Sequence, residues 1–168
     1  MTPILSNKKS KNKIYYSITY DSRIWPKRIK KVRKIIDSIL LNRKYFVNTK
    51  YKYYNLTFLL TDGKRLRKLN KVYKNNKTTT DVLTFTSYQK DSNNDWIRFC
   101  NIAISGSAIK SDSKRLKINF YDHLSHIIIH ALLHSNNYTH YVDKDFEKMK
   151  SIEIIILKKL NIKNPYNL

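Results

Sequence analysis

Apolar residues recur along the chain at two different spacings. In some segments they alternate with polar residues or form short apolar runs, a pattern typical of β-strands. In others they return every three or four positions, which places them on one face of an α-helix. The predicted strands are Ile14–Tyr20, Asn55–Leu60, Asp81–Phe85 and Trp96–Ser105, and the predicted helices are Trp25–Leu41, Asp62–Lys74, Ser107–Lys117, Asn119–His134 and Asp143–Leu160.

The order of these elements defines the expected fold. Strands and helices follow one another without an internal repeat or a linker, which predicts an α+β fold with a small, mostly four-stranded mixed sheet and helices packed on it. We expect residues 14–168 to form a single compact domain. Thr86–Asp95 is polar and is predicted to be a loop, so that residues 81–105 form a hairpin. Residues 1–13 are polar, with four lysines, and are expected to form a flexible basic N-terminus.

The chain is strongly basic. Its 168 residues include 34 Lys and Arg but only 12 Asp and Glu, which gives a formal net charge of +22. A surface of this charge attracts polyanions, and RNA or DNA is the expected partner. Lys, Asn, Ile and Tyr are all abundant, as in proteins encoded by A+T-rich genomes, so attraction to a membrane surface and plain solubility remain alternative explanations. The basic face of the helix over 25–41 is accordingly either solvated or RNA-facing.

Composition excludes several classes of protein. No apolar run approaches the ~20 residues of a membrane-spanning helix, and no apolar stretch follows residues 1–13 as in a signal peptide. The single cysteine, Cys100, excludes an intramolecular disulfide framework and a cysteine-based zinc finger. We therefore expect a cytoplasmic protein without a membrane partner.

Three histidines have the spacing of a metal site. His130 and His134 are four residues apart and share one face of the predicted helix over 119–134. His140 follows six residues later, and asparagines at 136 and 137 suit the chain reversal that would bring it back, because Asn tolerates the left-handed backbone that ends many helices. Three imidazoles with one open coordination position describe a catalytic zinc site.

Neighbouring residues limit the chemistry of this site. His126 lies one turn before His130 and is expected to have a core or hydrogen-bonding role, and His123 has no stronger claim to a metal. Zinc peptidases with this spacing have a glutamate general base directly after the first histidine, whereas this chain has Ala131 there. Peptidase chemistry is therefore disfavoured. A site without a carboxylate ligand keeps the full charge of the metal ion, which suits a phosphodiester substrate.

Six short motifs follow one another between residues 69 and 166. They read HALLHSNNYTH at 130–140, similar to H-[GA]-x-L-H-L-x-G-Y-D-H; LNKVYK at 69–74, similar to L-N-x-x-Y-R; TDVLTF at 80–85, similar to T-D-V-L-S-F; NIAIS at 101–105, similar to D-I-x-I-S; Met149 and Glu153, similar to M-x-x-x-E; and NPY at 164–166. In these motifs the chain resembles the YbeY family, bacterial rRNA maturation factors described as single-strand endoribonucleases.

The resemblance implies a site and a partner. His130, His134 and His140 would be the ligands of one Zn²⁺ in a metal-dependent hydrolase domain over residues 14–168. Lys74, which stands where the family has its catalytic arginine, would neutralise the charge that develops on an RNA phosphate. The partner would be RNA, namely rRNA of the small ribosomal subunit, in 3′-end maturation and ribosome quality control.

The chain also departs from the family pattern. Lys74 keeps the charge of the arginine but lacks its planar fork of donors. Cys100 and Asn101 replace Gly and Asp, which removes a carboxylate, and we expect Cys100 to be a buried strand thiol rather than a ligand. Thr139 replaces the Asp before the third histidine, and loss of a residue that orients a ligand weakens metal sites by about 10–100-fold.

Three functions are therefore compared. A metal-dependent endoribonuclease is the first. A non-catalytic ribosome-assembly or rRNA-binding factor with a weakened metal site is the second, and the substitutions at positions 74, 101 and 139 favour it. A zinc peptidase or another hydrolase is the third, and Ala131 argues against a peptidase.

Overall fold

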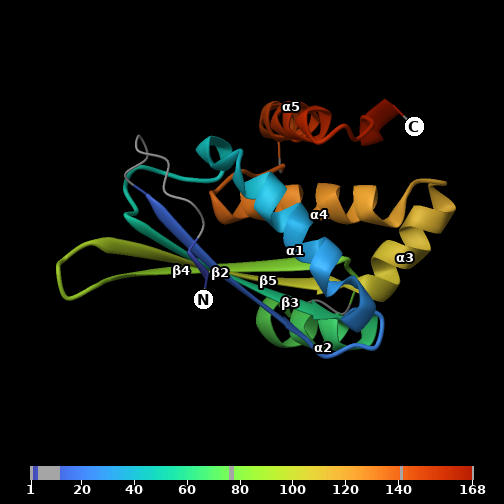
Figure 1. The fold of residues 1–168 in the computed structure, drawn as a ribbon, viewed down its shortest axis with the longest axis horizontal. Coiled ribbons are helices and arrows are strands. Elements are labelled where there is room, and N and C mark those ends of the chain that lie inside the picture. The colour runs from blue at the N-terminus through green and yellow to red at the C-terminus, as the bar shows by residue number, and fades with distance from the viewer. Residues whose placement is uncertain (1, 4–11, 76–77, 141, 168) are drawn as a thin grey trace.

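A mixed β-sheet forms the centre of the molecule. The structure is a computed structural model and describes residues 2–3, 12–75, 78–140 and 142–167. Its strands are β1 (Thr2–Pro3), β2 (Lys13–Tyr20), β3 (Tyr53–Thr61), β4 (Val82–Lys90) and β5 (Trp96–Ser105). Their order is β1-β2-β3-β5-β4 (Figure 1), with β2, β3 and β5 parallel and the two edge strands antiparallel. The predicted mixed sheet is confirmed, and β1 adds a two-residue fifth strand.

Helices cover both faces of this sheet. Within the described residues they are α1 (Ile29–Leu40), α2 (Gly63–Lys74), α3 (Gly106–Arg115), α4 (Phe120–Ser135) and α5 (Asp143–Lys159), with 3₁₀ turns at Pro26–Arg28, Arg43–Tyr45 and Pro165–Asn167. In Figure 1, α1 and α4 lie over one face of the sheet and α2 lies over the other, while α5 is stacked on the outer side of α4. The predicted α+β domain is confirmed, and α4 is enclosed between the sheet and α5.

Polar side chains define where three helices begin. The sequence offers Thr61 or Asp62 as the cap of α2, and in the structure Asp62 Oδ1 accepts a hydrogen bond from the Arg65 backbone N–H. Asn119 Oδ1 accepts from the Tyr121 N–H at the start of α4, and Ser105 Oγ accepts from the Ala108 N–H at the start of α3. Such caps satisfy N–H groups that have no partner within the helix.

The prediction of a loop over Thr86–Asp95 was wrong. Strand β4 continues to Lys90 and pairs with β5, with Ser87 opposite Phe99 and Lys90 opposite Trp96. The side chains of residues 86–90 are exposed, so this half of the strand lacks the apolar alternation that marks a strand in the sequence. Backbone hydrogen bonds with β5 keep residues 86–90 in the strand, and the turn between β4 and β5 comprises residues 91–95 alone.

The main core lies between the sheet and the layer formed by α1 and α4. Trp25, Phe58 and Ile128 are fully buried there, and Trp25 Nε1 donates to the Thr61 carbonyl at 2.9 Å. Ile156 of α5 is fully buried in the same cluster, on the outer side of α4. Full burial of side chains of this size stabilises a fold by about 1.5–3 kcal/mol each. A smaller cluster under α2 contains Leu66, Leu83 and Ala103. The helix that carries the predicted metal ligands is therefore fixed on both sides.

The expectation that residues 1–13 form a flexible basic N-terminus stays a prediction. Residues 1 and 4–11 of the expected flexible segment lie outside the described residues, whereas Thr2 and Pro3 pair with Tyr16 and Tyr15 of β2. Among the helices that the structure describes, none combines the length and the apolar character needed to cross a bilayer.

Candidate metal centre

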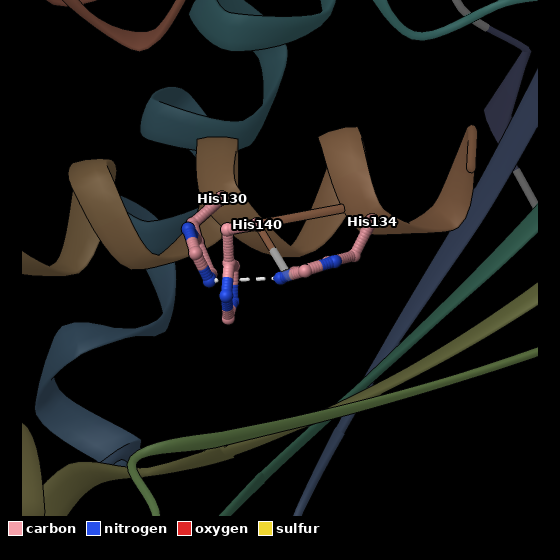
Figure 2. Close-up of side chains that lie close together, drawn as sticks. All are labelled: His130, His134 and His140. Carbon is pink, nitrogen blue, oxygen red and sulfur yellow. Dashed lines mark hydrogen bonds between the residues drawn. The ribbon is translucent and has the colours of Figure 1, made fainter. Parts of the chain in front are cut away.

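The end of α4 brings the three predicted histidines together. His130 and His134 lie on the last turns of the helix, and the chain then reverses through Asn137, whose φ of 66° is in the left-handed region. The Tyr138 N–H donates back to the Leu133 carbonyl, which closes the helix end. His140 returns beside the other two, and Figure 2 shows the three rings converging on one point below the helix. The predicted reversal is thus confirmed.

The geometry suits one metal ion. Each histidine offers a ring nitrogen, and these three atoms all lie within 4.8 Å of one another. The Nε2 atoms of His130 and His134 are 3.0 Å apart, and the ring of His140 is centred 5.5 Å from the first and 4.9 Å from the second. His130 and His134 are half-buried, and His140 is exposed on the solvent side. A cluster open on one side leaves a coordination position for water or substrate.

Hydrogen bonds orient two of the rings for coordination. His130 Nδ1 is 2.8 Å from Glu153 Oε1, and His134 Nδ1 is 2.9 Å from the Tyr138 carbonyl. Because both partners are acceptors, each Nδ1 carries a proton, and in the neutral rings each Nε2 presents a lone pair. Two lone pairs facing each other at 3.0 Å repel unless a cation lies between them. The donor set therefore fits a metal ion such as Zn²⁺.

Electrostatics keep the second of these rings neutral. Burial lowers the pKa of His134, the neighbouring His130 and His140 lower it as well, and its bond to the Tyr138 carbonyl opposes them, so that the pKa is about 4. A neutral imidazole is the form that binds metals. His134 is accordingly ready to bind a cation at neutral pH without first losing a proton.

A buried carboxylate on α5 lies behind the histidines. Burial disfavours ionisation of Glu153, but hydrogen bonds from His126, His130 and the Tyr166 hydroxyl outweigh it and lower its pKa to about 2. His126 Nε2 lies 3.0 Å from the carboxylate, so this histidine has the hydrogen-bonding role expected of it. Glu153 appeared in the sequence only as part of a short motif, because its contacts with α4 join segments distant in the chain.

The histidines line a pocket that also receives Lys74. Its volume is about 490 Å³, and its walls include Asp81, which precedes β4, and Thr84 and Thr86 of β4. Lys74 is the last residue of α2 and is exposed. The structure thus places the predicted catalytic residue and the predicted metal ligands around one cavity.

Arg98 is a residue that the sequence reasoning missed. It is 4% exposed and lies on β5, beneath the end of α4. Its guanidinium donates to the Ser135 carbonyl at 2.9 Å, to Asn137 Oδ1 at 2.8 Å and to the Tyr51 hydroxyl at 2.9 Å. Arg98 therefore fixes the turn that precedes His140. The signal in the sequence was that Arg98 is the lone charged residue of a mostly apolar strand.

The positions that depart from the family pattern fall in different places. Thr139 lines the pocket, and its hydroxyl donates to Asp145 Oδ2 at 2.9 Å at the start of α5. Asn101 lies in a separate apolar groove beside Tyr73, away from the histidines. Cys100 is fully buried, and burial raises the pKa of its thiol, as expected for a packed strand cysteine. Ala131 is also fully buried, so no general base occupies the position used by zinc peptidases.

The fold and the site define a class of protein, a small α+β domain with three imidazoles placed to bind one metal ion, as in metal-dependent hydrolases. A sequence profile described as "Endoribonuclease YbeY" matches residues 19–161. The chain therefore belongs to the YbeY family.

Individual relatives agree with this assignment. The chain is 35% identical over 153 residues to "Endoribonuclease YbeY" of Ehrlichia canis, covering 91% of this chain and 94% of the relative. It is 32% identical over 154 residues to the protein of the same name from Pelagibacter ubique, with 89% and 98% covered. The solution structure of a Thermotoga maritima protein matches with a TM-score of 0.53 and 18% identity over 88% of this chain and 92% of that chain, which shows the shared fold.

Proposed function

We propose that this chain is a Zn²⁺-dependent endoribonuclease that cleaves single-stranded RNA. The substrate would be rRNA of the small ribosomal subunit, in the maturation of its 3′ end and in ribosome quality control. The observation that carries the proposal is the convergence of His130, His134 and His140 in a pocket that also receives Lys74. Relatives named endoribonucleases and the net charge of +22 support RNA as the substrate.

The residues of the pocket have separate roles in this mechanism. His130, His134 and His140 would hold the ion, and Glu153 and the Tyr138 carbonyl fix the protons of two of these rings. When bound, Zn²⁺ polarises a phosphoryl oxygen and lowers the pKa of a water molecule towards ~7. The Lys74 ammonium neutralises the negative charge that develops on the phosphate during cleavage.

Basic residues near the pocket would bind the RNA backbone. Exposed lysines and arginines follow α2 towards Lys74, including Arg67, Lys68 and Lys71. They lead from the far end of the helix to the pocket rim. Contacts of this kind are independent of sequence and weaken as salt rises. The basic face of α1 provides further cations on the opposite side of the sheet.

Cleavage of single-stranded RNA by the purified chain tests the proposal. We expect cleavage in the presence of Zn²⁺, loss of cleavage in a chelator and recovery when Zn²⁺ is added back. The His134→Ala variant should be inactive at every zinc concentration while keeping the helical circular dichroism of the wild type. Full activity in the chelator, or an unimpaired variant, would rule the metal mechanism out.

A non-catalytic rRNA-binding factor is the second candidate function. Lys74 and Thr139 replace an arginine and an aspartate of the family pattern within the pocket itself, which favours this candidate. It predicts tight binding to small ribosomal subunits by wild type and His134→Ala alike, with no RNA cleavage by either. Zinc-dependent cleavage by the wild type decides for the nuclease.

A further inference from the structure

A second group of metal-ligating side chains lies farther back along α4. Asp81 precedes β4, Asp112 is on α3 and His123 is on the second turn of α4. Each offers one ligand atom, and these three atoms all lie within 4.8 Å of one another. The three residues come from three separate parts of the chain, namely the segment before β4, α3 and α4. The group is distinct from the three histidines, although Asp81 also lines their pocket.

The histidine of this group is buried and incompletely satisfied. His123 is only 8% exposed, and its Nε2 atom has no hydrogen-bond partner among the residues that the structure describes. A buried polar atom without a partner costs about 1–3 kcal/mol, and coordination of a cation is one way to remove that cost. Burial and the neighbouring His126 lower the pKa of this ring, which keeps it in the neutral form that binds metals.

The two carboxylates retain the capacity to bind a cation. Asp112 Oδ1 pairs with Arg115 at 2.7 Å. Thr80 Oγ1 lies 3.5 Å from Asp81 Oδ1, but its proton has a nearer acceptor in the Val82 carbonyl at 3.0 Å. The contacts of Asp112 and Asp81 each use one of the two carboxylate oxygens. Two half-buried carboxylates that face one histidine repel each other, and among the residues that the structure describes the ion pair made by this group is the one between Asp112 and Arg115. A divalent ion would supply the missing positive charge.

We propose that Asp81, Asp112 and His123 bind a second divalent metal ion. Carboxylate ligands suit Mn²⁺ and imidazole suits transition metals, so a mixed set of two carboxylates and one imidazole favours Mn²⁺ or a metal of similar character. Ligand atoms bound to one ion are separated by at most twice the bond length of about 2.2 Å, so side-chain shifts of at most a few tenths of an ångström would let these atoms share one ion. The ion adds positive charge beside the histidine pocket, at its Asp81 wall. The site is independent of the nuclease activity proposed above.

Mn²⁺ binding to metal-free protein tests this proposal. The His134→Ala variant serves as the background, because it disables the three-histidine site without touching the second group. Titration followed by the electron paramagnetic resonance of free Mn²⁺ should show one equivalent bound to this variant. Adding Asp112→Asn should weaken that binding at least about tenfold, since a neutral amide replaces a charged ligand. Asp112 does not line the histidine pocket.

A matched control variant and a second ligand variant show whether any loss of Mn²⁺ binding is specific to the proposed site. Asp122→Asn in the same background removes a carboxylate from α4 outside the group and should leave Mn²⁺ binding unchanged. His123→Gln is the second test variant and should weaken binding as Asp112→Asn does, with circular dichroism confirming that both remain folded. The proposal is overturned if the background variant binds no Mn²⁺, or if Asp112→Asn and His123→Gln bind it as tightly as Asp122→Asn.

Discussion

Lys74 stands at the rim of the histidine pocket, where the family pattern has an arginine. Lys74→Ala should lower the rate of RNA cleavage by about 100–1,000-fold, because one pre-placed charge that stabilises the transition state is lost. Lys71→Ala is the matched control, since Lys71 is exposed on the same helix but does not line the pocket. At saturating RNA, where the loss of one backbone contact does not limit substrate binding, its cleavage rate should stay within about twofold of wild type.

Lys74→Arg separates charge from geometry. An arginine adds a fork that binds phosphate through two hydrogen bonds, so this variant should cleave at least as fast as wild type. Initial rates on one single-stranded RNA, at fixed salt, measure all three variants. Equal rates for Lys74→Ala and Lys71→Ala would contradict the role assigned to Lys74.

Arg98 is the second residue with a testable role. Arg98→Lys cannot reach the Ser135 carbonyl, Asn137 Oδ1 and the Tyr51 hydroxyl at once. We expect the free energy of unfolding to fall by about 1–3 kcal/mol, the usual cost of buried polar groups left unpaired. Zinc affinity should fall as well, because the turn before His140 loosens. Urea unfolding and chelator competition measure the two effects.

Arg67→Lys provides the comparison for that experiment. Arg67 is exposed on α2, so this exchange should change neither stability nor zinc affinity measurably. If Arg98→Lys loses stability but binds zinc as tightly as Arg67→Lys, Arg98 supports the fold without positioning the site.

At the level of residues, the sequence predicted the three metal-ligating histidines but not the residues that orient them. Spacing along one helix was enough to bring His130 and His134 together, and Asn137 signalled the reversal before His140. The partners that orient them, Glu153 and Arg98, come from other elements. Their role depends on tertiary packing, which local periodicity does not describe.

At the level of secondary-structure elements, the turn that follows α4 gives a testable prediction for stability and zinc binding. Asn137 has a φ of 66°, and Asn161 after α5 has a φ of 57°. Alanine at either position should lower the free energy of unfolding by about 1–2 kcal/mol, because a Cβ without a polar side chain disfavours left-handed backbone. Only Asn137→Ala should also weaken zinc binding, since only Asn137 leads into the histidine site and contacts Arg98.

Thermal unfolding and zinc competition on both variants check this expectation. Asn137→Gly adds a third point, because glycine accepts the backbone conformation but lacks the amide oxygen that accepts from Arg98. Its stability should lie above that of Asn137→Ala. Equal zinc affinities for the alanine variants at 137 and 161 would show that the turn geometry does not control the site.

Helices were predicted more accurately than strands. The long helices have an apolar face with a clear period, and Asp62 and Asn119 marked two of their starts. Strand β4 was cut short because residues 86–90 are exposed and polar. Such a segment is a strand only through the hydrogen bonds of its neighbour, so its length follows from β5 rather than from its own side chains.

For the whole molecule, buried tyrosines predict sensitivity to alkaline pH. Burial raises the pKa of Tyr16 to about 12, helped by its hydrogen bond to Asp37, and burial also raises that of Tyr54 to about 12. Their neutral forms stabilise the fold fully below the unfolded pKa of about 10, and this stability is lost as pH rises from about 10 to 12. Each such proton steepens the fall by up to about 1.4 kcal/mol per pH unit.

Urea unfolding between pH 9 and 11 tests this dependence, with Tyr16→Phe as the variant. The variant should be less stable than wild type at pH 8, because it lacks the bond to Asp37, but its stability should fall less steeply above pH 10. Parallel curves for the two proteins would assign the alkaline sensitivity to other groups.

The arrangement of the whole molecule was the part least accessible from sequence. Fold class followed from the order of strands and helices, but nothing local indicated that β5 inserts between β3 and β4. That insertion places Arg98 beneath the end of α4 and Asp81 beside α3 and α4. The sequence around Arg98 and Asp81 does not indicate these contacts, which depend on the order of the strands in the sheet.

The order of synthesis determines when the residues that orient the metal-ligating histidines become available. His130, His134 and His140 leave the ribosome before Glu153, whose carboxylate accepts from His130 Nδ1, and before Tyr166, whose hydroxyl donates to that carboxylate. A nascent chain that has exposed only its histidines lacks the anion that orients one of them. The proton on His130 is therefore fixed only after α5 has docked on α4, and three histidines gathered before that point lack one of their orienting hydrogen bonds.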